Sequence, residues 1–212
     1  MFDNSFIYKR HSVRKFKDTK VPMEHIEEII KAGSFAPSGK NMQNWHFVVI
    51  NNKELIEKIA KTVEEKNKAI ADKILDENVK EKFTKGIRYQ LAFKNAPTVI
   101  LVYTGKYIPT GYNELKLAGA PQEELEALLA TASGVQGVSA AIENIMLTSA
   151  NMGYGTCWIT GPVYAAKEIS ETIGFKKEGY SLMALTPLGV PLDAEVKSPP
   201  RKPVEEIMTV IE

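Results

Sequence analysis

A group of side chains close to the N-terminus could hold an anion. Arg10 and Arg14 flank His11 and Ser12 in a short basic run. A guanidinium is planar and permanently charged, so two of them suit phosphate oxygens or the edge of a flat heterocycle. The hydroxyl of Ser12 can donate to the same anion. Runs of charge are more often solvated turns, and the rest of the sequence has to decide between the two interpretations.

Two glycine-containing segments fail the tests for nucleotide-binding motifs. Five residues separate Gly33 from Gly39, one more than a phosphate-binding loop has, and Asn41 stands where that loop needs Ser or Thr. The run Gly153–Gly155 follows a predicted helix, and Trp158 stands where the third glycine of a dinucleotide fingerprint belongs. The sequence therefore argues against an NTPase and against a Rossmann site.

Protein nucleophiles and metal sites are not indicated either. There is no G-x-S-x-G elbow, and the histidines His11, His25 and His46 include no pair at helical metal-ligand spacing. We expect His46 to lie in a strand with its ring nitrogens hydrogen-bonded within the fold, and Cys157 to be a buried, unreactive thiol. What remains is a set of donors that could bind an anionic, planar cofactor with its own chemistry: Arg10, Ser12, Arg14, Ser38, Asn41 and Arg201.

The composition is that of an ordinary globular protein. The chain has 212 residues, 44% of them apolar and 25% charged, with a formal net charge of +1, and we expect one domain over residues 1–212. A net charge this close to zero creates no overall positive potential that would attract nucleic acid, so no nucleic-acid partner is expected. No apolar run approaches the ~20 residues of a membrane helix, and no signal peptide is recognised. We therefore expect no membrane partner. A single cysteine allows no internal disulfide, so we expect a protein of the reducing cytoplasm.

Hydrophobic periodicity indicates the elements that would position these side chains. Pro22 opens a helix in which Ile26, Ile29 and Ile30 recur at helical spacing, and Gly33 limits its length. A polar loop rich in amides follows, and it leads into a buried strand. From there to the middle of the chain we expect one long helical pattern with a charged, solvated section, and then a second buried strand. In order, these segments are 36–44, 45–50, 53 to about 93, and 98–103.

The middle of the chain contains a segment rich in glycine and tyrosine, followed by the clearest helical pattern in the sequence. Glycines and tyrosines punctuate residues 104–119, which suits either a lid over a pocket or a plain connector. Pro121 starts a helix that we expect to run to about Ser149 as a central buried element. A break near Gly134–Gly137 is compatible with the low helix propensity of glycine.

The last third reads as alternating short elements. Residues 156–160 are strand-like, and residues 165–173 form a helix closed by Gly174. Residues 182–189 are a strand or strand edge, where Pro187 argues against a fully paired central position. The tail is extended and basic, and residues 204–211 could pair as a strand or lie along a neighbour.

Four segments, taken together, resemble the nitroreductase family of FMN-dependent NAD(P)H oxidoreductases. They occur in the family's order and span nearly the whole chain. They are residues 10–16 (RHSVRKF), 36–47 (APSGKNMQNWHF), 153–161 (GYGTCWITG) and 197–203 (KSPPRKP). Together they are specific for the family, though not for a substrate.

The resemblance implies an α+β fold with a central, mostly antiparallel sheet surrounded by helices. It also implies an intertwined homodimer, with a C-terminal arm that reaches the partner and two FMN molecules at the interface. NADH or NADPH would be the co-substrate, and the other partner would be a small-molecule electron acceptor. No metal and no catalytic side chain is implied, because the flavin carries the chemistry.

The same resemblance assigns the basic residues to the cofactor. Arg10 and Arg201 would hold the FMN phosphate, assisted by Ser12 and the backbone of His11. Arg14 would lie near the N1/O2 edge of the flavin and its ribityl chain.

The flavin ring would meet two further groups of residues. One group would come from the other subunit: Pro37, Ser38, Gly39 and Asn41. The backbone of the second group would face the ring and place a donor near N5 or O4: Trp158, Ile159 and Gly161.

Two departures from the family pattern affect the assignment. Many members carry an Asn and a Lys that meet the pyrimidine ring, and the comparable segment, Gly86–Ala92, gives no assignment for these contacts. In the tail, Pro199 stands where some members have a second basic residue, and Lys197 would substitute for it.

The implied reaction passes hydride from NAD(P)H to flavin N5 and then to an electron-poor acceptor such as a nitroaromatic or a quinone. Arg14 would stabilise the negative charge of the reduced flavin, and residues 104–119 would close over the pocket. Two alternatives stay open. One is an FMN-binding redox-sensing module without turnover, and the other is a family branch that fragments or dehalogenates its substrate.

Overall fold

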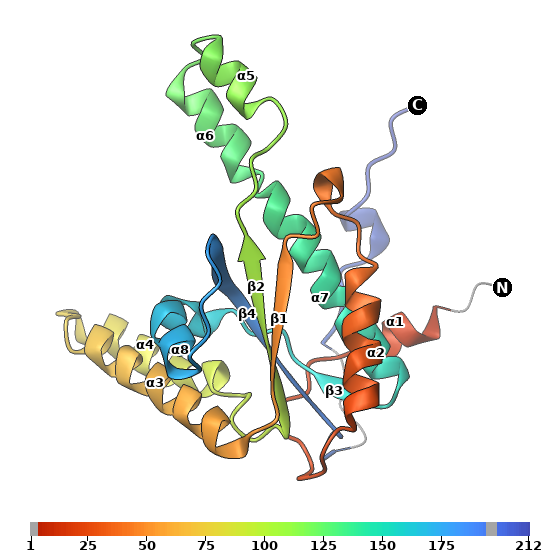
Figure 1. Ribbon diagram of the computed structural model, residues 1–212, viewed down its shortest axis with the longest axis vertical. Helices are drawn as coiled ribbons and strands as arrows, with labels where there is room; N and C mark the ends of the chain where they lie inside the picture. Colours follow the sequence, from red (N-terminus) through yellow and green to blue (C-terminus); the bar gives the residue numbers. More distant parts are fainter. Residues whose placement is uncertain (1–3, 194–198) are drawn as a thin grey trace.

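The fold is built on a four-stranded antiparallel sheet. In the computed structural model, which describes residues 4–193 and 199–212, the strand order is β1-β2-β4-β3 (Figure 1). The strands are β1 Trp45–Ile50, β2 Thr98–Gly105, β3 Gly155–Thr156 and β4 Tyr180–Gly189. Helices cover both faces, so the predicted α+β architecture with a central antiparallel sheet is confirmed.

The β2 strand runs through the centre of the molecule. Its Leu101 pairs with Val48 of β1 on one side and with Leu185 of β4 on the other. Apart from Thr104, every residue of β2 is buried. A strand buried on both faces needs apolar side chains at consecutive positions, which explains the unbroken run Val99–Tyr103.

One face of the sheet is covered by three helices and a 3-10 turn (Figure 1). These are α3 Lys53–Ala71, α4 Glu77–Gln90, α8 Ala166–Thr172 and η2 Gly161–Ala165. In α3, Ile56, Ile59 and Val63 recur at helical spacing and are fully buried in this core.

The single helical pattern predicted from residue 53 to about 93 is in fact two helices. The chain turns between α3 and α4, and Asp76 caps the second helix. Its Oδ1 accepts from the backbone N–H groups of Asn78 (2.9 Å) and Val79 (3.1 Å). The two helices pack against each other. Because both present an apolar stripe to the same core, periodicity alone does not separate them.

The other face of the sheet is covered by two long helices: α2 Met23–Ser34 and α7 Ser133–Asn151. Ile26 and Ile29 of α2 meet Ile142 and Ile145 of α7 in a second core, where all four are inaccessible or nearly so. The helix predicted after Pro22 is therefore confirmed, and so is the burial of the central helix.

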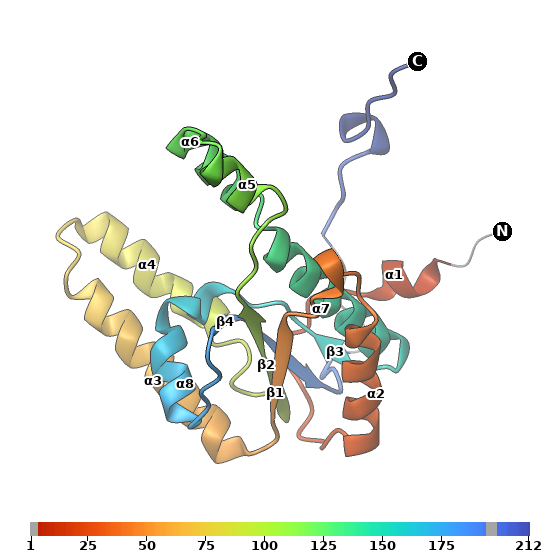
Figure 2. The same ribbon diagram turned by 45° about the horizontal axis from the view of Figure 1, so that its top comes forward.

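Between β2 and α7 the chain leaves the body as an excursion of two helices, α5 Tyr112–Leu117 and α6 Gln122–Ala130 (Figures 1 and 2). The segment 104–119 therefore contains a helix. The long helix expected from Pro121 is broken at Ala132, which has φ 50°. Gly134, expected near the break, lies inside α7, where a Cβ would come within 2.4 Å of the Tyr107 Cβ. Close packing explains this glycine.

By length and composition alone, the stretch Gln122–Asn151 could cross a membrane. The left-handed residue Ala132 divides it into two helices. The second of them, α7, buries Val138, Ile142 and Ile145 completely against the sheet and α2. An apolar stripe of this kind is what the central helix of a globular core presents.

Pro187 lies within the inner strand β4 but is paired on one side only, in agreement with the prediction that its position is not fully paired. It pairs with Val99 of β2. The N–H and C=O of Leu185 both bond to Ile159, so the backbone nitrogen two residues further along points the same way, toward Cys157. Within the described residues no backbone hydrogen bond joins positions 187 and 157. The missing N–H of proline therefore falls at a gap in the ladder.

Both ends of the chain lie at the margin of the molecule. The short α1 helix, Ser5–Lys9, packs against α7. Residues 199–212 extend away from the body with one 3-10 turn, η3 Val204–Glu206 (Figures 1 and 2). Residues 204–211 form no strand within the described chain, because all of them are exposed and pair with no strand of the sheet. The alternative that they lie along a neighbour stays a prediction. Lys197 lies outside the described residues.

Candidate functional site

The basic N-terminal segment is held against the segment that follows α7. The backbone N–H of Val13 donates to the Thr156 carbonyl at 2.8 Å, and Ser12 forms a parallel bridge with Thr156. Gly155 permits this approach, because a Cβ there would lie 2.6 Å from the Val13 Cβ. Two segments far apart in sequence, 10–14 and β3, therefore meet at one place.

The cationic side chains of this segment have different surroundings. The Arg10 side chain is 18% exposed, and its Nε lies 3.6 Å from Glu143 Oε1 on α7. Arg14 is exposed, and no ion pair involves it within the described residues. The His11 Nδ1 lies 2.9 Å from the Lys9 carbonyl, so the imidazole donates there. A carboxylate thus orients Arg10, while Arg14 is available to a ligand.

The run after β3 presents an orphaned buried donor. Ile159 exchanges backbone hydrogen bonds of 2.9 and 2.8 Å with Leu185, and this register sets Trp158 opposite Thr186. The indole Nε1 of Trp158 and the Oγ1 of Thr186 are both buried without a partner in the described part of the chain. Unpaired buried polar atoms are costly, so this is a place where a water or a polar ligand atom is needed.

A chain of three side chains ends beside Gly161. Asn67 Nδ2 donates to the Tyr164 hydroxyl at 3.3 Å, and that hydroxyl donates to Gln90 Oε1 at 2.6 Å. Burial raises the pKa of Tyr164, against a smaller opposite effect of the bond from Asn67, so the phenol stays protonated and keeps donating. A Cβ at Gly161 would lie 2.7 Å from the Gln90 Cγ.

Gln90 is a functional candidate that sequence reasoning did not single out. It lies in the segment Gly86–Ala92, for which the family pattern gave no assignment, and it is the last residue of α4. Tyr164 occupies its amide oxygen, and its NH2 group donates no hydrogen bond recorded within the described residues. Only the tertiary contact with Gly161 makes it a candidate, since an isolated glutamine at a helix end carries no sequence signal.

The loop at residues 37–41 lies elsewhere in the same chain. It packs on the first turns of α7, where a Cβ at Gly137 would lie 3.3 Å from the Pro37 carbonyl oxygen. Together with α7, the loop lines a hollow of about 510 Å³. Ser38 Oγ accepts the backbone N–H of Gln43 at 3.0 Å. Asn41 adopts a left-handed φ of 51°, which asparagine tolerates better than most residues.

One chain therefore brings some of the predicted residues together. Arg10 to Arg14 lie with the run that contains Trp158 and Ile159. The loop 37–41 meets α7 about two turns before Glu143, the partner of Arg10. Arg201 is exposed on the C-terminal arm, where its Nη1 donates to the Pro199 carbonyl at 3.1 Å.

The residues gathered at β3 fit an anionic, planar group. Arg10, Ser12 and Arg14 provide charge and hydroxyl donors, and the exposed Gly161 leaves its backbone open to a flat ring. The unpaired Nε1 of Trp158 adds a buried donor nearby. In the described residues, no cluster of three His, Cys, Asp or Glu side chains could hold a metal ion.

Comparison with known proteins decides the family. The sequence profile of the Nitroreductase family matches residues 7–190. This chain belongs to the nitroreductase family. Within it, a BluB-like flavoprotein from Clostridium difficile 630 is 44% identical, and its crystal structure matches with a TM-score of 0.94 over the whole of both chains. The resemblance inferred from four sequence segments is thereby confirmed.

More distant nitroreductase-family relatives have diverse names. A protein from Archaeoglobus fulgidus, provisionally named an NADH dehydrogenase/NAD(P)H nitroreductase, is 29% identical over 88% of this chain and 84% of its own length. The iodotyrosine deiodinase of Nematostella vectensis is 28% identical over 95% of this chain and 72% of its own. A Bacteroides fragilis nitroreductase with bound FMN, 19% identical over 98% and 97% of the chains, has a TM-score of 0.69 and bears on the fold alone.

Proposed function

We propose that this nitroreductase-family member is an FMN-dependent oxidoreductase that passes hydride from NADH or NADPH to an electron-poor acceptor such as a nitroaromatic or a quinone. FMN, when bound, supplies the hydride chemistry at its N5. The observation that carries the proposal is the family match over residues 7–190, with residues 10–14 packed on β3. The flavoprotein at 44% identity supports it.

The basic segment would bind the phosphate. Arg10 and Ser12 would give charge-assisted hydrogen bonds, which are roughly twice as strong as neutral ones. Glu143 holds the Arg10 guanidinium at 3.6 Å, and so limits the conformational freedom that binding has to remove. The guanidinium keeps further N–H donors for the phosphate oxygens. Arg201 would complete the phosphate site from the C-terminal arm.

Two side chains would act on the ring. Arg14, exposed and without an ion pair among the described residues, would stabilise negative charge at the N1/O2 edge. Gln90, oriented by Tyr164, would donate its amide N–H to the pyrimidine edge. Removing that donor in Gln90→Leu should lower the flavin reduction potential, because the reduced anionic flavin loses a hydrogen bond. An unchanged potential would contradict the assignment.

A homodimer would complete the site. The loop with Pro37, Ser38, Gly39 and Asn41 packs on the first turns of α7, and we propose that it serves the flavin of a second copy. The two-helix excursion at residues 106–132 would close over the pocket and select acceptors. The free, buried Cys157 is compatible with a reducing cytoplasm.

A second candidate function is a different flavin chemistry within the family. Relatives matched over nearly the whole of this chain include the BluB-like flavoprotein and iodotyrosine deiodinases. In this second candidate the physiological substrate is an aromatic compound other than a nitroaromatic, such as an iodinated phenol. A redox-sensing FMN module without turnover is the third candidate. All three share the cofactor and differ in the fate of the reduced flavin.

One experiment separates these candidates. The purified protein should be yellow with an FMN spectrum, and anaerobic NADH or NADPH should bleach it. Re-oxidation by nitroaromatics or quinones over many turnovers supports the proposed function. Rapid re-oxidation only by iodotyrosine supports the second candidate, and bleaching without turnover of any acceptor supports the sensor. A colourless protein that takes up no added FMN would refute all three.

A further inference from the structure

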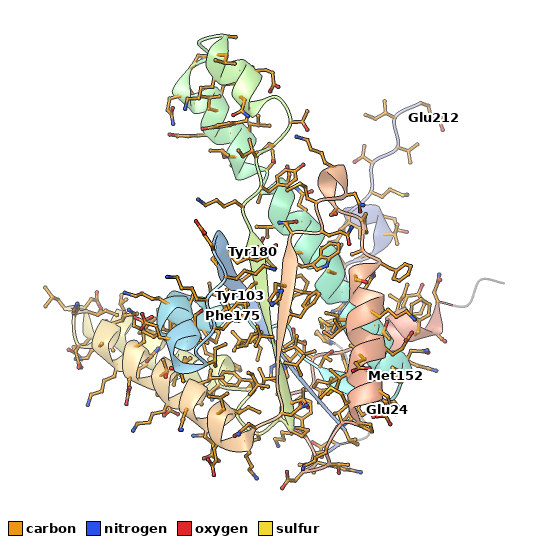
Figure 3. All side chains as sticks on the ribbon, in the orientation of Figure 1. Glu24, Tyr103, Met152, Phe175, Tyr180 and Glu212 are labelled. Atoms are coloured by element: carbon orange, nitrogen blue, oxygen red, sulfur yellow. The ribbon has the colours of Figure 1, made fainter. Side chains whose placement is uncertain are left out.

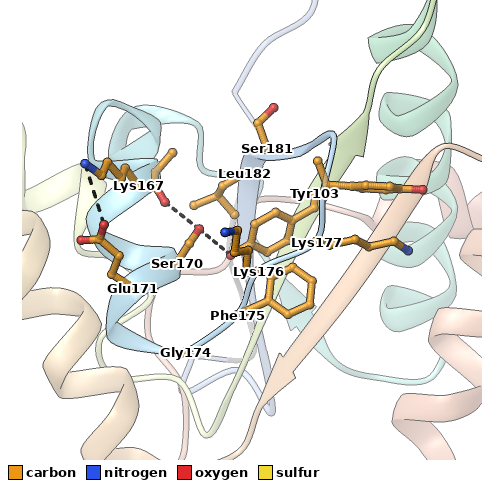
Figure 4. A pocket seen from close by; sticks show the side chains of 12 residues that line it. Tyr103, Lys167, Ser170, Glu171, Gly174, Phe175, Lys176, Lys177, Ser181 and Leu182 are labelled. Carbon is orange, nitrogen blue, oxygen red and sulfur yellow. Dashed lines mark hydrogen bonds and ion pairs between the residues drawn. The ribbon is translucent and has the colours of Figure 1, made fainter.

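A cavity of about 700 Å³ lies away from the β3 segment. It is bounded by α8, the turn that follows it, and the ends of β2 and β4 (Figure 4). None of the residues proposed to hold FMN lines it. Its volume is within the range of small-molecule sites, and the proposed oxidoreductase chemistry does not use it.

Aromatic rings form one wall of this cavity. Tyr103, Phe175 and Tyr180 lie together at one end of the sheet (Figure 3). The Tyr103 and Phe175 ring centroids are 4.7 Å apart, and His46 stacks on the outer side of Phe175 at 5.2 Å and 15°. A Cβ at Gly105 would lie 3.0 Å from the Tyr180 ring, so the glycine lets this ring lie close to β2. These contacts hold the aromatic wall in place without a ligand.

The hydroxyl groups on the floor of the cavity are hydrogen-bonded within the protein. Ser170 Oγ donates to the Ala166 carbonyl at 2.7 Å, so the Tyr103 hydroxyl is the donor in its 3.0 Å bond to Ser170 (Figure 4). Burial raises the pKa of Tyr103, outweighing the bond to Ser170, which keeps it a neutral phenol. A ligand that enters this end needs no polar atoms there, and an aromatic or apolar end suits it.

The lining carries an excess of positive charge. It includes three lysines, Lys167, Lys176 and Lys177, against one acid, Glu171. Glu171 lies 3.9 Å from Lys167 and offsets it. Lys177 Nζ lies 3.2 Å from His46 Nδ1 and 4.2 Å from the Tyr180 ring centroid, and neither partner is an anion. Lys176 has no ion pair within the described residues.

We propose that this cavity binds a small aromatic carboxylate, with its ring against Tyr103 and Phe175 and its carboxylate at Lys176. The aromatic wall and the satisfied floor call for a flat apolar body. Lys176, which has no ion pair within the described residues, calls for a single negative charge at the opposite end. The ammonium group of Lys177 lies instead with His46, on the outer side of Phe175 (Figure 4). The site stands on this chain's own residues and does not depend on the flavin.

Titration of the purified, flavin-loaded protein with 2-naphthoate by calorimetry at low salt tests the proposal. Saturable binding is expected, and the neutral isostere 2-naphthamide should bind several-fold more weakly, because it lacks the charge that Lys176 meets. In the Lys176→Gln variant, naphthoate should lose several-fold in affinity and the preference over the amide should disappear. Phe175→Leu should weaken both ligands several-fold.

The matched control is Lys58→Gln, which removes an exposed lysine of α3 that does not line the cavity. It should leave naphthoate affinity unchanged. Absence of saturable binding to the wild type overturns the proposal. Binding that survives unchanged in both Lys176→Gln and Phe175→Leu also overturns it, because naphthoate then occupies another place. A perturbed flavin absorbance spectrum in that case would locate the ligand at the cofactor instead.

Discussion

At the scale of single residues, Arg10 and Arg201 carry the phosphate assignment. Arg10→Ala and Arg201→Ala should each weaken FMN binding about tenfold or more, because a hydrogen bond to a charged group contributes roughly 1.5–3 kcal/mol. Fluorescence titration of apoprotein with FMN measures the change. The fold should tolerate both substitutions, since Arg201 is exposed and Arg10 loses only one pair, with Glu143.

Glu143→Gln is the matched control for Arg10. It keeps the shape of the residue that touches Arg10 and removes the competing negative charge. FMN affinity should stay the same or rise, whereas Arg10→Ala should lower it. Unchanged affinity in both arginine variants would place the phosphate elsewhere.

His46 should make stability depend on pH. Burial, and then the charge of Lys177, lower the pKa of His46 below the ordinary value of 6.5. Above about pH 6.5 the folded and unfolded states are both neutral at this residue, so its full contribution is present. Below that pH the unfolded state takes up the proton first, and stability falls until the folded pKa is passed.

Urea unfolding between about pH 7.5 and about pH 5.5 measures this effect. The loss of stability on acidification should be larger in the wild type than in His46→Gln. It should be intermediate in Lys177→Met, which removes one of the two causes and leaves the burial. Equal losses in the wild type and His46→Gln would show that this imidazole does not take part.

At the scale of elements, Asn44 closes the base of the two-helix excursion. Its buried Nδ2 lies 3.2 Å from the carbonyls of Gly105 and Gly134, at the end of β2 and the start of α7, and 3.3 Å from Thr104 Oγ1. Asn44→Ala should cost about 1–3 kcal/mol, because buried acceptors lose their donor. It should also loosen residues 106–132, so limited proteolysis within them should accelerate.

Asn52→Ala provides a comparison of the same residue type. Asn52 caps α3 by accepting from Leu55 N–H at 3.0 Å, and its loss should cost about 1 kcal/mol. It lies far from the excursion in the chain, so it should not accelerate cleavage there. Faster cleavage of residues 106–132 in both variants would point to global destabilisation rather than to the role of Asn44.

At the scale of the whole molecule, the C-terminal arm leaves apolar side chains uncovered. Ile207, Met208 and Ile211 are 68%, 59% and 92% exposed, and the arm extends away from its own chain, with Glu212 far from the sheet (Figure 3). We expect sedimentation to give twice the chain mass of 23.6 kDa. Deleting residues 199–212 should weaken the dimer and FMN retention together.

Arg201→Ala separates the two effects of that deletion. It should weaken FMN binding but leave the dimer intact, because the apolar arm remains. A stable monomer with full FMN occupancy would contradict a site shared between two chains. A deletion variant that stays dimeric would show that the arm is not needed for association.

The sequence predicted elements well wherever the chemistry was local. The helix after Pro22, the strands at residues 45–50 and 98–103, and the buried central helix follow from periodicity and turn residues. An error lies where two elements share one core. The turn before Asp76 is hidden because α3 and α4 present one continuous apolar pattern. The prediction that Pro187 is not fully paired holds within an inner strand, because the ladder to β3 is interrupted at that position.

The sequence by itself determined the family and the fold class, and it predicts an anion site at Arg10, Ser12 and Arg14, because these rest on residue types and spacing along the chain. Only the tertiary structure decided which residues meet. It set residues 10–14 on β3, oriented Gln90 through Tyr164, and packed the loop 37–41 on the first turns of α7. It also assembled the aromatic and cationic cavity from β2, α8 and β4. Contacts between distant segments depend on how helices and strands pack, and spacing along the chain does not encode that.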